Sequence, residues 1–438
     1  MTTEVKSLSN ANPHALASLT DNTLLNCMQC GFCLPHCPTY SLDPLEKYSP
    51  RGRIQLTRLL YEQSSDIHSA NLLEPNSEAI QLSNEISESI HSCLGCLACQ
   101  TACPAGVEYE SIFEAAKNLL QSEEMKQQKL KSILIALGLK IIATPWLLTV
   151  FSKILFFLQE TSLSRHLPLS LMRSWNLSPK FSEQPFHQSV KTDVPKSSNP
   201  NKVRLFTGCI MNHAFYQEHL ATLQLLQSHG FEVIISRESL CCGALHAHNG
   251  FGEEGKQLAQ KIFKLSSEGI PLIVNSAGCG SWLKHSLDKM NSTREGAEIT
   301  PRNPKVYDLS EFLFQTGFSP QLPKLKERIA YQDACHLEHG QKIKKEPRQL
   351  LSLVFENLIE LSSPECCGSA GIYNLTESLR SEQLLERKIN ALRALNLDYV
   401  TTANPGCLLQ LRYGIQKYHL KTKAIHISEA LLMGLKKK

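Results

Sequence analysis

The chain contains, at residues 27–38, the stretch Cys27-Met-Gln-Cys30-Gly-Phe-Cys33-Leu-Pro-His-Cys37-Pro38, and it contains a second copy, Cys93-Leu-Gly-Cys96-Leu-Ala-Cys99-Gln-Thr-Ala-Cys103-Pro104. Both follow C-x2-C-x2-C-x3-C-P, the bacterial spacing for ligands of a [4Fe–4S] cluster. Two-residue gaps let a tight loop aim three thiolates at one cluster, and the fourth cysteine ligates the other cluster. The proline that follows fixes φ and turns the chain. The two runs predict an α-helical, ferredoxin-like domain over residues 20–120.

This crossed pattern predicts two [4Fe–4S] clusters, each with three ligands from one run and one from the other. A zinc site is the alternative, but zinc prefers two C-x2-C pairs at a distance, so two complete runs favour iron–sulfur. The predicted ligand sets are Cys27, Cys30, Cys33 and Cys103 for the first cluster, and Cys37, Cys93, Cys96 and Cys99 for the second.

An insert of 55 residues separates the two runs. We expect a short helix over residues 53–62 in it. Arg51 and Arg53 lie at the start of that helix. Their charges either lie near a cluster and raise its potential, or they are a solvated helix start.

Composition narrows the class of protein. The chain has 438 residues, 42% of them apolar, which is enough to bury large cores, and 16 are cysteine. Residues 1–19 are polar without an apolar run, so we expect no secretory signal and a cytoplasmic protein. Cysteines in that reducing compartment more often serve metals or redox chemistry than disulfides. The formal net charge of only +4 argues against a nucleic-acid partner.

The C-terminal half of the sequence repeats itself. Residues 203–209 resemble 329–335, Cys241-Cys242-Gly243 resembles Cys366-Cys367-Gly368, and residues 272–279 resemble 399–407. These offsets are 126, 125 and 128 residues, and residues 306–313 resemble 424–431 at an offset of 118, a constant period within loop variation, as expected for a duplicated unit. We expect two tandem Cys-Cys-Gly domains at residues 203–315 and 326–435.

Each repeat alternates predicted strands with predicted helices. Helical periodicity covers residues 215–228, 253–267, 346–360 and 377–395, and a β-like run covers residues 232–236. Such alternation predicts a mostly parallel sheet, in which loops after the carboxyl ends of the strands gather at one edge. The predicted fold class is therefore α/β, with an α-helical ferredoxin-like N-terminal domain and two tandem α/β Cys-Cys-Gly repeats.

The cysteines of each repeat fall in those loops, so we expect four thiols to meet in each unit. They are candidate ligands of one or two further clusters, and a vicinal dithiol or a buried cysteine beside glycine is the alternative. Nearby histidines are ligands, proton carriers or solvated loop residues: His246, His248, His336 and His339. The candidate cysteines are Cys209, Cys241, Cys242 and Cys279 in the first repeat, and Cys335, Cys366, Cys367 and Cys407 in the second.

Residues 121–202 form a connector unlike either half. Residues 125–202 carry 11 Lys or Arg against 3 Asp or Glu, a net charge of +8. The longest charge-free stretch, residues 141–152, has 12 residues, whereas a bilayer span needs ~20. Basic charge with apolar residues and no span favours helices that dock on a membrane surface or a partner, and a hairpin packed on its own domains is the alternative. Residues 191–201 are predicted to be a linker.

The sequence offers no clear nucleotide site. Gly250-Phe-Gly-Glu-Glu-Gly255 fits G-x-G-x-x-G, but no buried strand precedes it and two glutamates would face the phosphates. We interpret it as a turn that starts a helix, and we assign no catalytic residue to this chain. A chain with electron carriers and no site for a two-electron organic reaction should receive its electrons from another subunit.

Two cysteine runs followed by two Cys-Cys-Gly repeats resemble a family of iron–sulfur subunits. It includes the iron–sulfur subunit of glycolate oxidase, the lactate-utilisation iron–sulfur protein, and related chains of anaerobic glycerol-3-phosphate dehydrogenase and of heterodisulfide reductase. Residues 27–33, Ser49-Pro-Arg-Gly-Arg-Ile54, the connector and Asn404-Pro-Gly-Cys407 resemble the glycolate oxidase subunit most. The resemblance implies flavoprotein partner subunits that bind FAD and oxidise glycolate to glyoxylate. It also implies that electrons pass through the clusters to a membrane quinone or another acceptor, at the inner face of the cell membrane.

The sequence departs from the heterodisulfide-reductase pattern at one point in each repeat. That pattern ends in C-x-x-C, whereas the repeats here end in Cys279-Gly-Ser-Trp282 and Cys407-Leu-Leu-Gln410. The fifth cysteine is missing both times. This counts against a thiol or heterodisulfide reductase, which stays the alternative function together with the iron–sulfur subunit of a lactate or glycerol-3-phosphate dehydrogenase.

Overall fold

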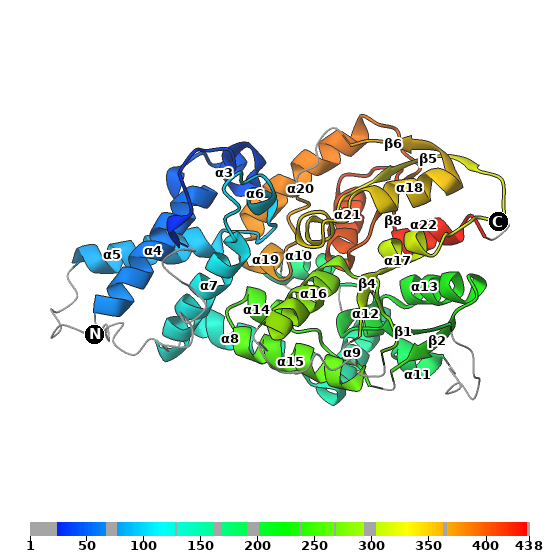
Figure 1. The fold of residues 1–438 in the computed structure, drawn as a ribbon, viewed down its shortest axis with the longest axis horizontal. Coiled ribbons are helices and arrows are strands. Elements are labelled where there is room, and N and C mark those ends of the chain that lie inside the picture. Colours follow the sequence, from blue (N-terminus) through cyan, green and yellow to red (C-terminus); the bar gives the residue numbers. More distant parts are fainter. Residues whose placement is uncertain are drawn as a thin grey trace. The chain divides into compact units, whose positions relative to one another are not determined.

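The structure, a computed structural model, describes residues 24–66, 77–127, 129–161, 169–190, 201–236, 238–266, 269–292, 304–361 and 366–435. The predicted polar segment 1–19 and all but the last residue of the predicted linker 191–201 lie outside these residues. The described chain forms two compact units (Figure 1). The first comprises residues up to Leu139 together with Leu245–Gly255 and Ala370–Leu384, and the second comprises the rest.

The first unit is built from helices. Its long helices α4 (Pro50–Asp66), α5 (Ser77–His91) and α7 (Tyr109–Lys126) pack against one another, with Ile54, Ile86 and Phe113 among their buried side chains. Proline begins α4, where its fixed φ favours a helix start, and α4 extends the helix predicted over 53–62 at both ends. Short helices lie within the cysteine runs or after the first of them: η1 (Leu34–His36), α3 (Pro38–Leu42), η2 (Glu46–Tyr48) and α6 (Ala98–Thr101).

Two segments from the C-terminal half complete this first unit, and each directly follows a Cys-Cys-Gly motif. In Leu245–Gly255, which contains most of α14 (Ala244–His248), the chain leads to Gly252, whose backbone N–H donates to Oδ1 of Asn118 at 3.0 Å. In Ala370–Leu384, which contains α19 (Tyr373–Thr376), the Tyr373 hydroxyl donates to the Ser92 carbonyl at 3.1 Å. The sequence repeat did not indicate that these two segments belong to the first unit. The domain limits drawn from the sequence stay a prediction.

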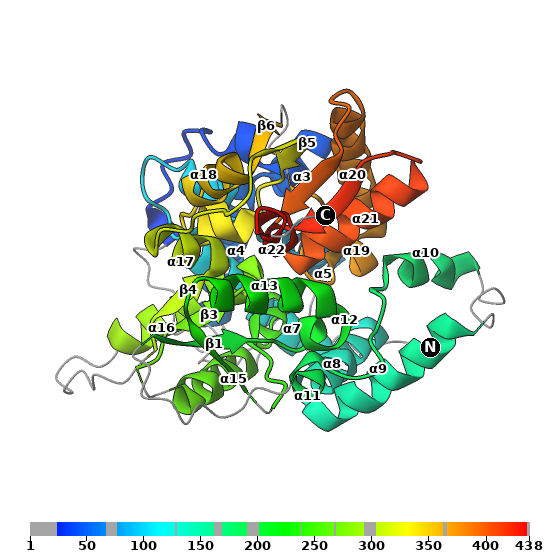
Figure 2. The ribbon, with the colours of Figure 1, turned by 90° about the vertical axis from the view of Figure 1, so that its right-hand side faces the viewer.

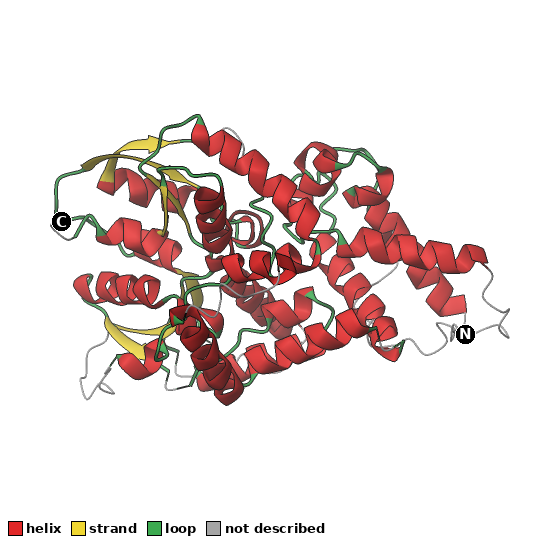
Figure 3. Cartoon of the chain, turned by 180° about the vertical axis from the view of Figure 1, so that it is seen from behind, coloured by secondary structure: helices red, strands yellow, loops and turns green. Residues whose placement is uncertain are grey.

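The second unit contains two four-stranded sheets with identical strand order. Figure 3 shows the strands in yellow among the helices. The first is ordered β2-β1-β3-β4 and the second β6-β5-β7-β8, and all pairings are parallel. The parallel α/β architecture expected for each repeat is confirmed. The strands are β1 (Lys202–Phe206), β2 (Glu232–Ile235), β3 (Leu272–Val274), β4 (Val306–Asp308), β5 (Leu325–Tyr331), β6 (Phe355–Ile359), β7 (Tyr399–Thr402) and β8 (Lys423–His426).

Corresponding helices connect the strands of both sheets. In the first repeat they are α12 (Ile210–Ala214), α13 (Tyr216–Ser228), α15 (Gly252–Leu265), α16 (Ala277–Ser292) and α17 (Leu309–Gln315). The start of α15 at Gly252 agrees with the interpretation of residues 250–255 as a helix-start turn. In the second repeat they are the π-helix η4 (His336–Gly340), α18 (Lys345–Val354), α20 (Ser378–Arg393), α21 (Pro405–Lys417) and α22 (Ile427–Leu432).

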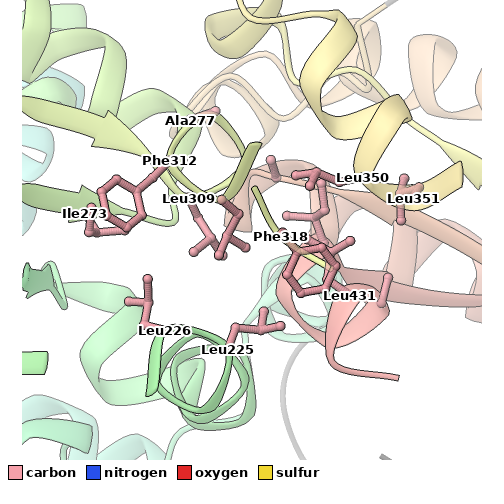
Figure 4. Packing of buried hydrophobic residues seen from close by; sticks show 14 of the residues in the cluster. Leu225, Leu226, Ile273, Ala277, Leu309, Phe312, Phe318, Leu350, Leu351 and Leu431 are labelled. Carbon is pink, nitrogen blue, oxygen red and sulfur yellow. The ribbon is translucent and has the colours of Figure 1, made fainter. Parts of the chain in front are cut away.

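A shared core joins the two repeats. Helix α13 packs on α22, and α17 packs on α18, as the turned view also shows (Figure 2). Leu225 and Phe312 of the first repeat and Leu350 and Leu431 of the second belong to one buried cluster (Figure 4). Burying a side chain of this size contributes about 1.5–3 kcal/mol. The two repeats therefore form one body rather than two independent domains.

One predicted helix is wrong in its second half. Helical periodicity continued from residue 346 to 360, but α18 ends at Val354 and β6 begins at Phe355. The segment has a strand partner, because Leu358 pairs with Ile329 and Ile359 with Ala330 in the ladder to β5. Sheet pairing overrides the helical pattern because the aromatic and branched residues of β6 suit a half-buried strand.

The connector is helical. It consists of α8 (Leu130–Ala143), α9 (Pro145–Glu160), α10 (Leu169–Leu177) and α11 (Phe186–Ser189). Among the residues that the structure describes, no single helix has the length and apolarity to cross a membrane. Helices α8 and α9 pass that test only as a pair bent by 102°.

The last helix of each repeat is capped in the same way by a different residue. Asp308 accepts a hydrogen bond from Ser310 N at 2.7 Å, and His426 accepts one through Nδ1 from Ser428 N at 3.2 Å. Each is completed as a capping box by a glutamate three residues on. Burial lowers the pKa of His426 to about 3, so the ring is neutral and its Nδ1 can accept.

This cap predicts acid lability of the second unit. The pKa of His426 lies below its unfolded value, so its stabilisation is complete above about pH 6.5 and is lost as the pH falls towards 3. His426→Asn keeps a capping acceptor that does not titrate, and at pH 5 it should abolish about 2 kcal/mol of acid destabilisation. Acid unfolding followed by circular dichroism measures the shift. His419→Asn, at an exposed position with φ of 53°, is the matched control; equal shifts in both variants would contradict this account.

Candidate iron–sulfur sites

The first unit contains two cavities that are lined by cysteines. One is lined by Cys27, Cys30, Cys33 and Cys103, and Cys99 also reaches it. The other is lined by Cys37, Cys93, Cys96 and Cys99. Each cavity thus gathers three cysteines from one run and one from the other. The grouping agrees with the crossed ligand sets, and the assignment of each thiolate to a cluster is a proposal that these cavities support.

Both cysteine loops use the same unusual backbone conformation. Gln29 (φ 55°) and Gly31 (φ 84°) occupy the second and fourth positions after Cys27, and Gly95 (φ 60°) and Leu97 (φ 63°) occupy the same positions after Cys93. Left-handed backbone at a non-glycine residue costs of order 1 kcal/mol and persists only where the surroundings impose it. Each run has glycine at only one of its two positions, so the sequence did not reveal this constraint.

Arg53 is the nearest buried cation to the second cavity. Its side chain is 1% exposed and lines that cavity. Nε donates to the Ser89 carbonyl at 2.9 Å, Nη2 donates to Thr39 Oγ1 at 3.0 Å, and Nη1 lies 3.8 Å from Sγ of Cys37. These contacts fix the guanidinium against a cysteine. Of the two interpretations given for this arginine, the structure supports a charge near a cluster.

Arg51 differs from Arg53 although both come from the same motif. It lines the first cavity, but its side chain is 30% exposed and pairs with Glu46 at 2.7 Å. Its positive charge is therefore partly neutralised and screened by solvent. The Tyr109 hydroxyl, which the sequence did not single out, lies 3.5 Å from Sγ of Cys93.

The four cysteines of the first repeat meet beyond the carboxyl ends of β1, β2 and β3. Sγ of Cys242 lies 3.1 Å from Sγ of Cys279, and Cys241 is hydrogen-bonded to both Cys209 and Cys242. Hydrogen bonding to neighbouring thiols together with burial raises the pKa of Cys209 and of Cys242 well above the ordinary value. Without a metal these thiols stay protonated, and coordination would displace the protons.

The second repeat gathers its cysteines in the same manner. Cys366 is hydrogen-bonded to Cys335 and Cys367, and Cys367 also to Cys407. The glycine after each cysteine pair, Gly243 or Gly368, has positive φ (93° and 81°), so the chain can reverse directly behind the two thiols. This requirement explains why the motif ends in glycine.

Asn404 connects the two cysteine groups of the second unit. Its Oδ1 accepts from the backbone N–H of Gly278, the residue before Cys279, at 3.2 Å. Its Nδ2 lies 3.6 Å from Sγ of Cys407. The backbone N–H of Ala277 also donates to the Ala403 carbonyl at 3.1 Å. The loops after β3 and β7 are therefore adjacent, which places the two Cys-Cys-Gly sites next to each other.

The histidines singled out in the sequence differ in their contacts. Nδ1 of His336 lies 3.5 Å from Sγ of Cys335, on the π-helix η4. His339 on the same helix lies 3.8 Å from the Glu338 carboxylate. His246 is buried on α14, and His248 is partly buried there. His336 is thus the histidine placed directly beside a candidate ligand.

The donor set suits iron–sulfur clusters. A cubane cluster is held by four cysteine thiolates. All 16 cysteines are free of disulfides and so could act as such ligands. When bound, such a cluster accepts and releases one electron at a time. The chain's own contribution is to hold the thiolates, to exclude water around Cys37, Cys99 and the Cys-Cys-Gly groups, and to set the local charge through Arg53.

Comparison with known proteins agrees with this geometry. Residues 23–107 match the 4Fe-4S dicluster domain family, and residues 203–284 and 329–412 each match the cysteine-rich domain family. The chain is thus an iron–sulfur protein with a [4Fe–4S] dicluster domain and two cysteine-rich domains.

Relatives narrow the class further. The chain is 32% identical to the probable glycolate oxidase iron–sulfur subunit of Bacillus subtilis, over 99% of this chain and 98% of that protein. It is 25% identical to the glycolate oxidase iron–sulfur subunit of Escherichia coli, over 94% and 95%. The protein belongs to the family of glycolate oxidase iron–sulfur subunits. A crystal structure of a hypothetical protein from Helicobacter pylori shares the fold, with a TM-score of 0.54, 13% identity, and coverage of 96% of this chain and 74% of that one.

Serine substitutions test the crossed ligand sets. Cys103→Ser should impair the same cluster as Cys30→Ser, although the two residues belong to different runs. Cys37→Ser should match Cys96→Ser in the same way, because those two line the second cavity. Electron paramagnetic resonance of the reduced variants, with iron and sulfide analysis, identifies the cluster affected. If Cys103→Ser matched Cys96→Ser instead, the pairing would be wrong.

Removing the charge of Arg53 should lower the potential of the second cluster. Arg53→Gln should shift that midpoint by roughly −50 to −100 mV, since about 1–2 kcal/mol of charge interaction is lost. Arg53→Lys keeps the charge and should shift it less, which separates charge from packing. Arg51→Gln, whose partly exposed side chain lines the other cavity, should leave the potential of the second cluster unchanged. A redox titration with spectroscopic detection measures all three; an unchanged potential in Arg53→Gln would refute the electrostatic role.

Proposed function

We propose that this chain carries electrons in a complex that oxidises glycolate to glyoxylate. The oxidation releases two electrons and two protons, and we assign that step to FAD on flavoprotein partner subunits, because the chain offers thiol sites and no assigned catalytic residue. The iron–sulfur sites then accept the electrons one at a time and deliver them to a quinone or another acceptor. The observation that carries this proposal is the full-length similarity to glycolate oxidase iron–sulfur subunits combined with four cysteine quartets.

The first cavity is the best entry point for electrons. Cys30 in its loop is exposed, and the neighbouring side chains of Met28 and Phe32 are 68% and 66% exposed. Exposed apolar side chains beside a redox site are suited to docking a partner protein. We assign the flavoprotein contact to this loop.

The alternative of thiol or heterodisulfide reduction is less well supported. The positions where that pattern has a fifth cysteine hold Trp282 and Gln410, and both are buried (3% and 0% exposed). No thiol is therefore available there. If Cys241→Ser and Cys366→Ser abolished disulfide turnover by the purified chain, that alternative would replace the electron-transfer role.

We further assign the protein a peripheral location on the inner face of the cell membrane, where a quinone is accessible. The exposed apolar side chains of the connector support this assignment, including Trp146, Ile154 and Phe157.

Reconstitution tests the proposed function. The purified, cluster-loaded chain alone should not oxidise glycolate with an artificial acceptor, and adding the flavoprotein partners should restore oxidation and reduce the clusters. Lactate and glycerol 3-phosphate serve as comparison substrates, and preference for either would change the substrate assignment. Glycolate oxidation by the chain alone would refute the division of labour between subunits.

A further inference from the structure

Helix α9 packs one face against the first Cys-Cys-Gly site. Leu148 and Ser152 on this face are 1% and 2% exposed. Leu148 belongs to the same buried cluster as Cys209 and Cys241. Thr149 Oγ1 lies 3.3 Å from Nε2 of His213, on the helix that follows Cys209. Helix α9 therefore forms part of the wall of this cysteine site.

The opposite face of α9 is apolar and exposed (Figure 2 shows the helix). Trp146, Val150, Ile154 and Phe157 are 66%, 51%, 53% and 65% exposed. Their spacing of four, four and three residues places them on one stripe of the helix. A helix on a protein surface normally turns polar residues outward. The stripe on α9 instead exposes apolar residues, so this face is suited to an apolar environment.

The charges around this stripe are mainly positive. Residues 130–160, which contain α8 and α9, have three lysines, and Glu160 at the end of α9 is their one acidic residue. Lys140, in the last turn of α8, and Lys153 of α9 are exposed. Anionic lipid headgroups attract such lysines, whereas an apolar protein partner would not require them. The 16 residues of α9 extend ~24 Å, which is less than the ~30 Å of a bilayer core, so the helix is suited to lying along the surface.

We propose that α9 lies in the headgroup region of an anionic bilayer, with the stripe Trp146, Val150, Ile154 and Phe157 turned towards the acyl chains. This inference rests on the proposed peripheral location and specifies the surface responsible for it. Because Leu148 on the other face contacts the cysteine site, Cys209 and Cys241 are held about one helix diameter, ~10 Å, from lipid. Of the two Cys-Cys-Gly sites, the first is then the one whose wall α9 forms and the one that would pass electrons to a lipid-dissolved acceptor.

Vesicle binding by the cluster-loaded full chain tests the proposal. The protein should bind vesicles of phosphatidylglycerol and phosphatidylcholine, and should bind pure phosphatidylcholine much more weakly. Ile154→Gln with Phe157→Gln should weaken binding ~100-fold, and Lys140→Glu with Lys153→Glu ~30-fold. Lipids brominated in the acyl chain should quench tryptophan emission in the native chain and less in Trp146→Phe, because Trp282 is buried at 3% exposure and Trp175 on α10 is partly buried.

Matched variants elsewhere in the second unit control for general changes of surface. Phe314→Gln with Leu353→Gln removes exposed apolar side chains, and Lys324→Glu with Lys421→Glu reverses exposed charges. Neither pair should alter vesicle binding. No binding, or equal losses in these controls, would overturn the proposal, as would α9 variants that lose the flavoprotein or a second copy of the chain instead of lipid. Glycolate oxidation by the reconstituted complex with a water-dissolved acceptor should persist in the α9 variants; its absence from the native complex would refute the proposed function and not the docking surface.

Discussion

Every candidate site in this protein depends on bringing thiols from distant parts of the chain to one place. A single loop supplies three cysteines at most, and the others come from residues tens of positions away. The second unit meets this constraint with parallel sheets, because parallel strands end at the same edge and their loops meet there. In the first unit, each cavity is lined by three cysteines of one run and the fourth cysteine of the other, which is the arrangement that the proposed crossed ligand sets require. Sheet order, helix packing and the glycine behind each cysteine pair all serve this convergence.

The sequence predicted those features that depend on regular spacing of residues along the chain. The four cysteine groups, the duplicated parallel units and the helix starting after Gly250 follow from periodicity and fixed intervals, which are local properties of the chain. The strand β6 did not follow, because its helical periodicity was overridden by pairing with β5, a contact between residues about 30 apart. Gln29 and Leu97 also escaped prediction, since their left-handed backbone is imposed by the folded loops.

The arginine at the second cavity shows more clearly what could not be predicted from the sequence. Arg51 and Arg53 are two residues apart in one motif, and nothing in the sequence ranks them. Helix α4 separates them, because two residues along a helix differ by about 200° of rotation and so point to opposite sides. Arg53 becomes a buried cation beside Cys37, and Arg51 becomes a partly exposed partner of Glu46. Duplication likewise preserved the geometry of the last helix cap while replacing aspartate with histidine.

The segments that follow the two Cys-Cys-Gly motifs affect how the protein is made. Residues up to Leu139 leave the ribosome first, but their unit also includes Leu245–Gly255 and Ala370–Leu384. At 5–20 residues per second, roughly 10–50 s separate the synthesis of Leu139 from that of Leu384. During that interval the N-terminal cysteines are present without the hydroxyl of Tyr373 that later bonds to Ser92. Assembly of the dicluster domain is therefore coupled to translation of the last repeat, and a truncated chain would leave its first unit unfinished.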